Sequence, residues 1–80
     1  MKTIKINLSN DFHNTDTSVR AKVLSNGKLF VTRATWDAAC RRLCSASDCE
    51  CGSVRGPMLD NDGRRYGAEL DNDGVVLFAA

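Results

Sequence analysis

Residues 19–31, VRAKVLSNGKLFV, decide the fold of this 80-residue chain. Apolar and basic residues alternate over the first five positions, which is the pattern of a strand with one buried face. Asn26-Gly27 is a preferred pair for a two-residue type I′ turn, because both residues tolerate a positive φ. The apolar residues 29–31 are then expected to pair back on the first strand. This stretch therefore predicts a β-hairpin.

A helix is predicted directly after the hairpin, over residues 33–44. Thr32 or Thr35 can cap its amino end. Apolar and thiol side chains recur at the spacing of one helical face, and they are Trp36, Ala39, Cys40, Leu43 and Cys44. The helix is therefore amphipathic, and we expect Trp36 to be buried against a sheet.

The flanking segments predict further short strands. Residues 4–8 alternate apolar with polar side chains, and a polar stretch over residues 9–16 is expected to form the turn that follows. Two copies of Leu-Asp-Asn-Asp-Gly, at 59–63 and 70–74, predict hairpin turns within a C-terminal meander. The predicted fold is α+β, one domain over residues 1–80, with a small antiparallel sheet of about five to six strands packed in two layers against one amphipathic helix.

Composition narrows the classes of partner. No apolar run approaches the roughly 20 residues of a membrane span, and residues 1–6 lack a signal-peptide block, so we expect a cytoplasmic protein with no membrane partner. The net charge is +1, but residues 1–45 carry eight Lys and Arg against three acids, and residues 46–80 carry three against seven. The low net charge disfavours nucleic acid as a partner, and a cluster of basic residues on one face would favour it.

All four cysteines fall within residues 40–51. Thiolates and imidazole are the ligands that structural zinc prefers, and an 80-residue domain benefits from such a cross-link. Two ligand sets fit the sequence: the four cysteines, or Cys44, Cys49 and Cys51 with His13, leaving Cys40 in the core. The spacing C-x3-C-x4-C-x-C departs from the usual paired motifs, so reduced thiols that only fill space under the helix end are the alternative. We expect that the protein requires no cofactor, and structural zinc is the one cofactor that its sequence could bind.

No catalytic set is recognisable. His13 is the only histidine, and no Ser or Thr stands in a nucleophile motif, so we predict that the protein is not an enzyme. Arg41, Arg42 and Arg55 have planar guanidinium groups suited to phosphate oxygens, although pairing with nearby acids would explain them equally well.

Three motifs resemble a family of short bacteriophage and prophage proteins. They are Asn-Asp-Phe-His-Asn-Thr at 10–15, Arg-Arg-Leu-Cys at 41–44 and Cys-Glu-Cys-Gly at 49–52, and the similarity covers about the first two thirds of the chain. Cys40 is not part of the family pattern, which favours the ligand set that includes His13. The resemblance implies a phage accessory protein that works in the cytoplasm of the bacterial host cell.

Small phage proteins commonly neutralise host immunity, so the resemblance implies a counter-defence protein similar to viral sponges. Such a protein would sequester a host immune nucleotide messenger, cyclic or of the ADP-ribose type, without turnover, and a homo-oligomer would complete its pocket. The residues expected to contact the base are Asn10, Phe12, His13 and Asn14. Those expected to bind the phosphates are Arg41, Arg42 and Arg55.

Two alternatives remain open. The acidic second half could imitate nucleic acid in a protein inhibitor of a CRISPR complex or of another host defence protein. The chain could instead be a small zinc-stabilised module that interacts with nucleic acid or with a protein.

Overall fold

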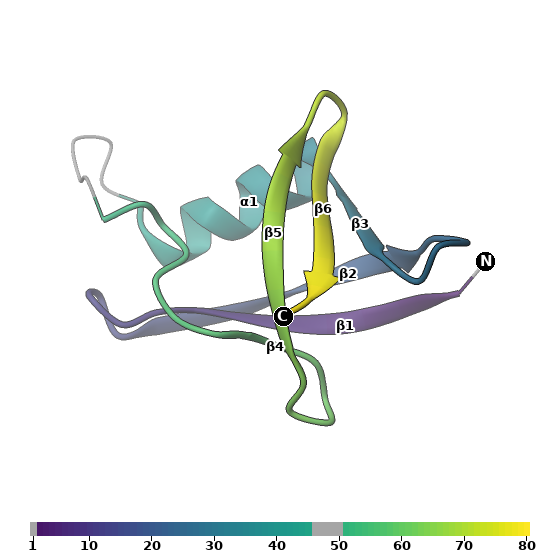
Figure 1. Cartoon of the computed structure of the whole chain (residues 1–80). Coiled ribbons are helices and arrows are strands. Elements are labelled where there is room, and N and C mark those ends of the chain that lie inside the picture. Colours follow the sequence, from purple (N-terminus) through teal and green to yellow (C-terminus); the bar gives the residue numbers. More distant parts are fainter. Residues whose placement is uncertain (1, 46–50) are drawn as a thin grey trace.

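The computed structural model describes residues 2–45 and 51–80, which form six strands and one helix (Figure 1). The elements are β1 (Thr3–Asn10), β2 (Thr15–Val23), β3 (Leu29–Thr32), α1 (Arg33–Leu43), β4 (Met58–Leu59), β5 (Arg65–Asp71) and β6 (Gly74–Ala79). The predicted antiparallel sheet with one helix is confirmed. No helix in this part of the chain is long and apolar enough to span a membrane.

The sheet closes into a small barrel in the order β1-β2-β3-β6-β5-β4, and every neighbouring pair of strands is antiparallel. Closure was not predicted. The strand that closes the barrel, β4, has only two residues. It pairs with β1 only through Leu59 and Asn7. A strand this short has no periodic pattern, so the sequence could not reveal it.

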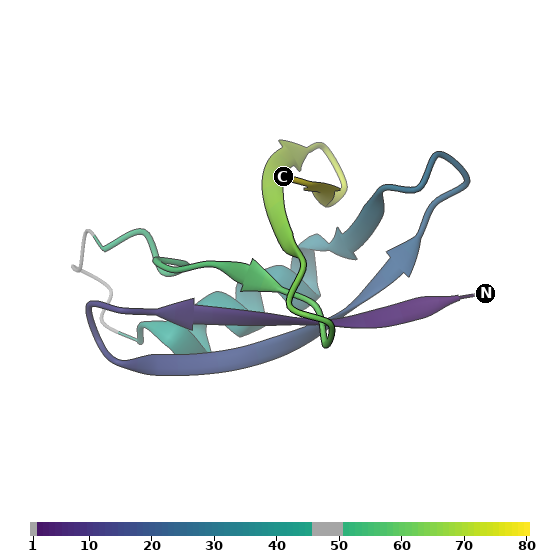
Figure 2. The same cartoon turned by 60° about the horizontal axis from the view of Figure 1, so that its bottom comes forward.

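The β1–β2 hairpin is the longest element of the barrel, and its tip lies beside the carboxyl end of α1 (Figure 2). The strands pair from Thr3–Lys22 to Asn10–Thr15, so the turn contains only residues 11–14. The predicted turn over 9–16 was therefore too wide. Polar residues continue the strands because the backbone ladder is complete there and because Asn10, which points inward, has hydrogen-bond partners.

The second hairpin, between β2 and β3, is confirmed, but the predicted type I′ turn is wrong. Gly27 has a φ of 86°, whereas Asn26 is not in the positive-φ region. The backbone N–H of Gly27 donates to the Leu24 carbonyl, and the N–H of Leu24 donates to the Lys28 carbonyl. These bonds define a three-residue loop with glycine in the left-handed position, a common alternative to the two-residue turn.

The helix covers β2, β3 and β6. Thr32 caps it as predicted, because its hydroxyl oxygen accepts the N–H of Thr35. Trp36 is half-buried and packs against the core, so the prediction of its burial is confirmed in part. The core residues come from both hairpins, the helix and β6: Ile6, Leu8, Val19, Ala21, Leu29, Val31, Ala39, Leu43, Val75 and Leu77.

The repeated Asp-Asn-Asp-Gly segments form the β4–β5 and β5–β6 turns, which confirms the predicted meander. In the first turn, the Asp60 carboxylate accepts the N–H groups of Asp62 and Arg64 and the hydroxyl of Tyr66. These bonds, the one from Arg64 foremost, lower the pKa of Asp60. Both oxygens of this carboxylate are therefore used within the turn.

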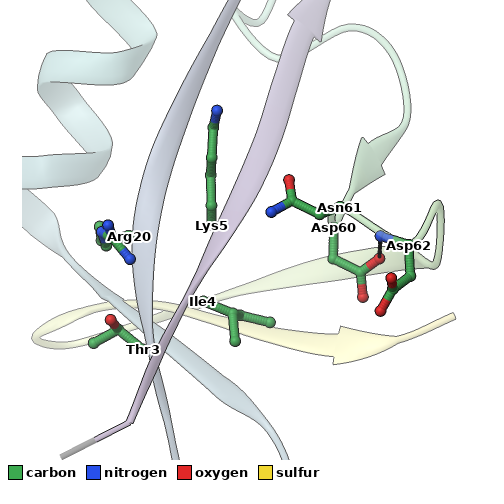
Figure 3. A pocket seen from close by; sticks show the side chains of 7 residues that line it. All are labelled: Thr3, Ile4, Lys5, Arg20, Asp60, Asn61 and Asp62. Atoms are coloured by element: carbon green, nitrogen blue, oxygen red, sulfur yellow. Dashed lines mark hydrogen bonds between the residues drawn. The ribbon is translucent and has the colours of Figure 1, made fainter.

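The short closing strand leaves a hollow between β1 and the β4–β5 turn (Figure 3). Its volume is about 490 Å³, and its lining residues are Thr3, Ile4, Lys5, Arg20, Asp60, Asn61 and Asp62. The hollow lies on the amino-terminal half of β1, away from the hairpin tip. Basic side chains line it from β1 and β2, and the turn lines it from the other side.

Candidate metal centre

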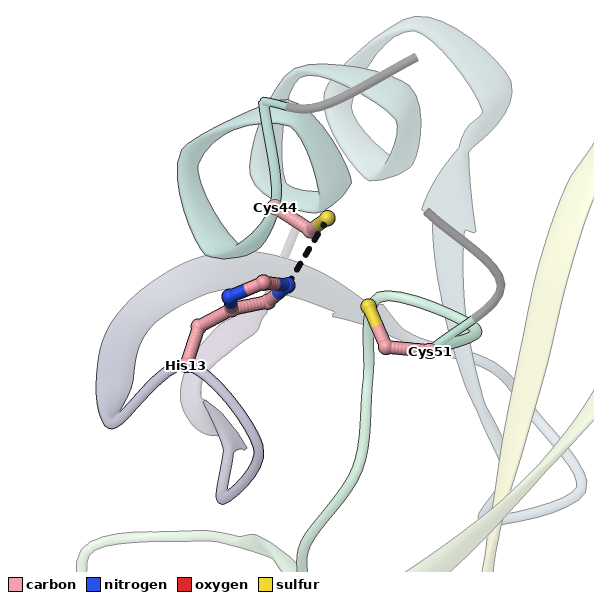
Figure 4. Close-up of side chains that lie close together, drawn as sticks. All are labelled: His13, Cys44 and Cys51. Carbon is pink, nitrogen blue, oxygen red and sulfur yellow. Dashed lines mark hydrogen bonds between the residues drawn. The ribbon is translucent and has the colours of Figure 1, made fainter. Parts of the chain in front are cut away.

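Three segments meet at the tip of the β1–β2 hairpin and bring together His13, Cys44 and Cys51 (Figure 4). His13 belongs to the turn after β1, Cys44 follows α1, and Cys51 lies in the loop that leads to β4. Their three ligand atoms lie within 4.8 Å of one another. His13 Nε2 and Cys44 Sγ are 3.3 Å apart. These are three of the four ligands in the predicted set that includes His13.

The three side chains fit the geometry and the chemistry of zinc. In a tetrahedral site with Zn–S bonds of about 2.3 Å and Zn–N bonds of about 2.1 Å, neighbouring ligand atoms are about 3.5–3.8 Å apart. Separations up to 4.8 Å therefore have to close by only about 1 Å, within the reach of small side-chain rotations. Two sulfurs and one imidazole nitrogen match structural zinc better than they match the oxygen-preferring Ca²⁺ or Mg²⁺.

The barrel fixes the position of Cys44. Leu43, the last helical residue, is buried in the core. Its carbonyl, which has no partner within the helix, accepts a hydrogen bond of 2.7 Å from the Thr15 hydroxyl. Arg42 also donates to the hydroxyl of Thr17 and to the carbonyl of Ser18. The carboxyl end of α1 is therefore held against β2, and Cys44 follows it directly.

Asn10 connects the other two candidate ligands. Its side chain is fully buried, and its amide nitrogen donates to Cys51 Sγ at 3.3 Å and to the Ser53 carbonyl at 2.6 Å. Its amide oxygen accepts the backbone N–H of His13 at 2.8 Å. One side chain thus orients the His13 turn and donates a hydrogen bond to a candidate sulfur ligand. Outer hydrogen bonds of this kind orient ligands and tune metal affinity.

Cys40 is not part of this cluster. It is half-buried, and burial is the main cause that raises the pKa of its thiol, with Asp37 adding to the shift. The protonated thiol is the form that does not bind metal. Among the described residues, the structure therefore favours the ligand set with His13 over the set of four cysteines. The remaining predicted ligand, Cys49, lies outside the described residues.

An aromatic ring and a cation flank the cluster. Phe12 is 65% exposed, and its ring meets that of His13 edge to face at 4.9 Å between centroids. The Arg55 guanidinium carbon lies 5.7 Å from the centroid of the Phe12 ring. The backbone of Arg55 is fixed to the end of β1 by hydrogen bonds with Ser9 and Asp11. Phe12, His13 and Arg55 therefore form one continuous surface, called here the tip surface.

The other predicted ligand-binding residues lie elsewhere or are engaged within the chain. Asn10 is buried, and its amide is used inside the protein. Arg42 bonds to β2. Arg41 is exposed on α1, where its charge acts on the thiol of Cys40. Asn14 is exposed in the left-handed conformation, with a φ of 55°. Sequence reasoning missed that Asn10 supports the metal ligands, because the bond to Cys51 spans 41 positions of the chain.

No protein-family model, curated protein or solved structure matches this chain.

Proposed function

We propose that this protein is a small barrel stabilised by one structural zinc ion and that it acts as an interaction module without turnover. The observation that carries the proposal is the convergence of His13, Cys44 and Cys51 from three separate segments. In this proposal Cys49, two positions before Cys51, supplies the fourth ligand. Bound zinc would cross-link the hairpin tip, the end of α1 and the loop before β4.

A structural role fits this ligand set better than a catalytic role. Catalytic zinc keeps one position open for water or substrate, whereas three thiolates and one imidazole fill all four positions. The cluster also has a mechanical use. Barrels of this size bury too little surface to be very stable. Among the described residues between Cys51 and β4, none belongs to a strand. Zinc would hold this loop on the barrel.

Two matched cysteine variants test the ligand set. Zinc-loaded protein is expected to contain one zinc per chain by native mass spectrometry. Cys49→Ser should reduce zinc retention at least tenfold, because one thiolate ligand is removed. Cys40→Ser should retain zinc fully, because Cys40 is outside the cluster. Metal-free wild-type protein after purification with added zinc would contradict the proposal, and so would loss of zinc only in Cys40→Ser.

We propose, as a second candidate function, that the tip surface captures a nucleotide. The observation in its favour is the exposed ring of Phe12 beside the Arg55 guanidinium. The ring could stack on a base while the guanidinium holds a phosphate. The biological role would be phage counter-defence, in which the protein sequesters a host immune messenger of the cyclic or ADP-ribose type. A homo-oligomer would enclose the ligand more fully than one tip surface.

Removal of the Phe12 ring should weaken such binding at least about tenfold, since stacking on an aromatic side chain contributes about 1–3 kcal/mol per base. The measurement is isothermal titration of zinc-loaded protein with cyclic dinucleotides, cyclic oligonucleotides and ADP-ribose. Leu70→Ala is the control, because Leu70 is 75% exposed on β5 and is not part of the tip surface. Absence of binding across this panel, or equal affinities for Phe12→Ala and wild type, would rule out capture at the tip surface.

A further inference from the structure

We propose that the outer face of the β1–β2 hairpin binds the phosphodiester backbone of nucleic acid. Lys5 on β1 and Arg20 and Lys22 on β2 share this face, called here the basic face. All three residues are exposed. The sequence alone did not show this clustering, because β1 and β2 are separated by the hairpin tip.

The strand register places the three cations together. Lys5 is the cross-strand partner of Arg20, and Thr3 is the partner of Lys22. The residues between them, Ile4 and Ala21, point to the other face of the sheet. Figure 3 shows Lys5 and Arg20 on adjacent strands, with the β4–β5 turn across the hollow from them.

The pairing brings Lys5 and Arg20 especially close. The backbone N–H of Val23 donates to the Lys2 carbonyl, so Lys2 and Val23 form a hydrogen-bonded pair. Along the ladder from this pair, non-hydrogen-bonded and hydrogen-bonded pairs alternate. Lys5 and Arg20 therefore form a non-hydrogen-bonded pair, the type with a Cα separation of about 4.5 Å. Like charges directly opposite each other on one face are destabilising. An anion bound between them would remove this repulsion.

Within residues 2–45 and 51–80, no carboxylate forms an ion pair with Lys5, Arg20 or Lys22. Asp16 lies on the same face but at the far end of the hairpin, opposite Ser9. Asp60 and Asp62 line the same hollow as Lys5 and Arg20, from the side of the β4–β5 turn, and they limit the extent of the basic face there. The basic face is therefore a compact group of three cations, bounded by these two acids across the hollow.

The chemistry of the face favours a phosphate backbone over a protein or a membrane. The Arg20 fork can hold two phosphate oxygens, the two lysines add point charges, and the Thr3 hydroxyl and Asn7 amide can donate from the same face. No apolar side chain from β1 or β2 lies on this face to anchor a protein partner or insert into a lipid bilayer. It also has no aromatic side chain on these strands, so binding should depend little on base sequence.

This inference extends the proposed interaction module, but its residues are separate from the metal centre. The candidate ligands lie at the hairpin tip and beyond, whereas the basic face lies on the amino-terminal half of β1 and its partner β2 residues. The two proposals can therefore fail independently. Zinc content is measured on every sample, so a nucleic-acid complex of metal-free protein would overturn only the zinc proposal.

The test is fluorescence anisotropy of zinc-loaded, full-length protein with a labelled 20-nucleotide oligothymidylate and with a 20-base-pair duplex, between 50 and 200 mM salt. Three phosphate contacts predict a slope of log affinity against log salt of about −2 for the single strand. The variant Lys5→Gln/Arg20→Gln/Lys22→Gln should bind at least about tenfold more weakly at 50 mM salt and should lose most of this slope.

A matched control removes the same charge elsewhere, through Lys28→Gln/Arg33→Gln/Arg65→Gln, and should bind as wild type does. Circular dichroism checks that both triple variants keep the fold. No binding at 50 mM salt would overturn the inference, as would equal losses in the two variants. Tighter binding to vesicles of anionic phospholipid than to either oligonucleotide, lost in the basic-face variant, would also overturn it by assigning the face to a membrane.

Discussion

Removal of zinc is expected to lower the free energy of unfolding of the barrel by about 4 kcal/mol when free zinc is about 1,000 times its dissociation constant. The physical reason is that zinc would bind only where three distant segments meet, so it stabilises the folded chain and not the unfolded one. Urea unfolding of zinc-loaded protein, with and without a chelator, measures the effect. The midpoint should fall in the chelator, and the slope of the transition should change little.

Two variants separate this effect from general damage. His13→Ala should already have the lower stability of the chelated wild type and should respond little to chelator, because it lacks one ligand. Cys40→Ser should respond to chelator as the wild type does. Identical midpoints for wild-type protein with and without chelator would contradict a structural zinc, whatever the metal content of the purified sample.

Local patterns predicted most of the elements. Alternation of apolar residues located β1 and β2, the apolar run 29–31 after the Asn26-Gly27 turn located β3, and the helical spacing located α1 to within one residue at its end. The Asp-Asn-Asp-Gly repeats located both turns of the meander. These features depend on neighbours in the sequence. Barrel closure depends on a single Asn7–Leu59 pairing across 52 positions, and no local pattern encodes such a pair.

The candidate site, like the fold, could be predicted from the sequence only in part. The sequence indicated which residue types could bind zinc, but it admitted two ligand sets. Spatial proximity separates them, because His13 lies beside Cys44 and Cys51, and Cys40 does not join the group. The same limitation applies to the arginines: all three looked equivalent in sequence, yet Arg42 bonds to β2 and Arg55 lies over Phe12.

Substitution of Asn10 by alanine is expected to weaken zinc binding by about 10- to 100-fold, the range found when hydrogen-bond partners of metal ligands are removed. The Asn10 side chain bonds to both the His13 turn and the Cys51 sulfur. Without its amide, the turn that carries His13 loses a bond, and the Cys51 sulfur loses a donor that favours its charged form. Zinc affinity is measured by competition with a chromophoric chelator.

Asn10→Ala should also destabilise the metal-free protein, by about 3 kcal/mol, because the carbonyl of the half-buried Ser53 and the His13 N–H each lose a partner. Measuring both quantities distinguishes support of the ligands from support of the fold.

Asn10→Asp sharpens the distinction: its carboxylate can still accept the His13 N–H, but it cannot donate to Cys51. It should therefore weaken zinc at least as much as Asn10→Ala, whereas the exposed control Asn61→Ala should change neither quantity. If Asn10→Ala lowered stability and left zinc affinity unchanged, Asn10 would support only the loop, and the cluster would bind zinc without it.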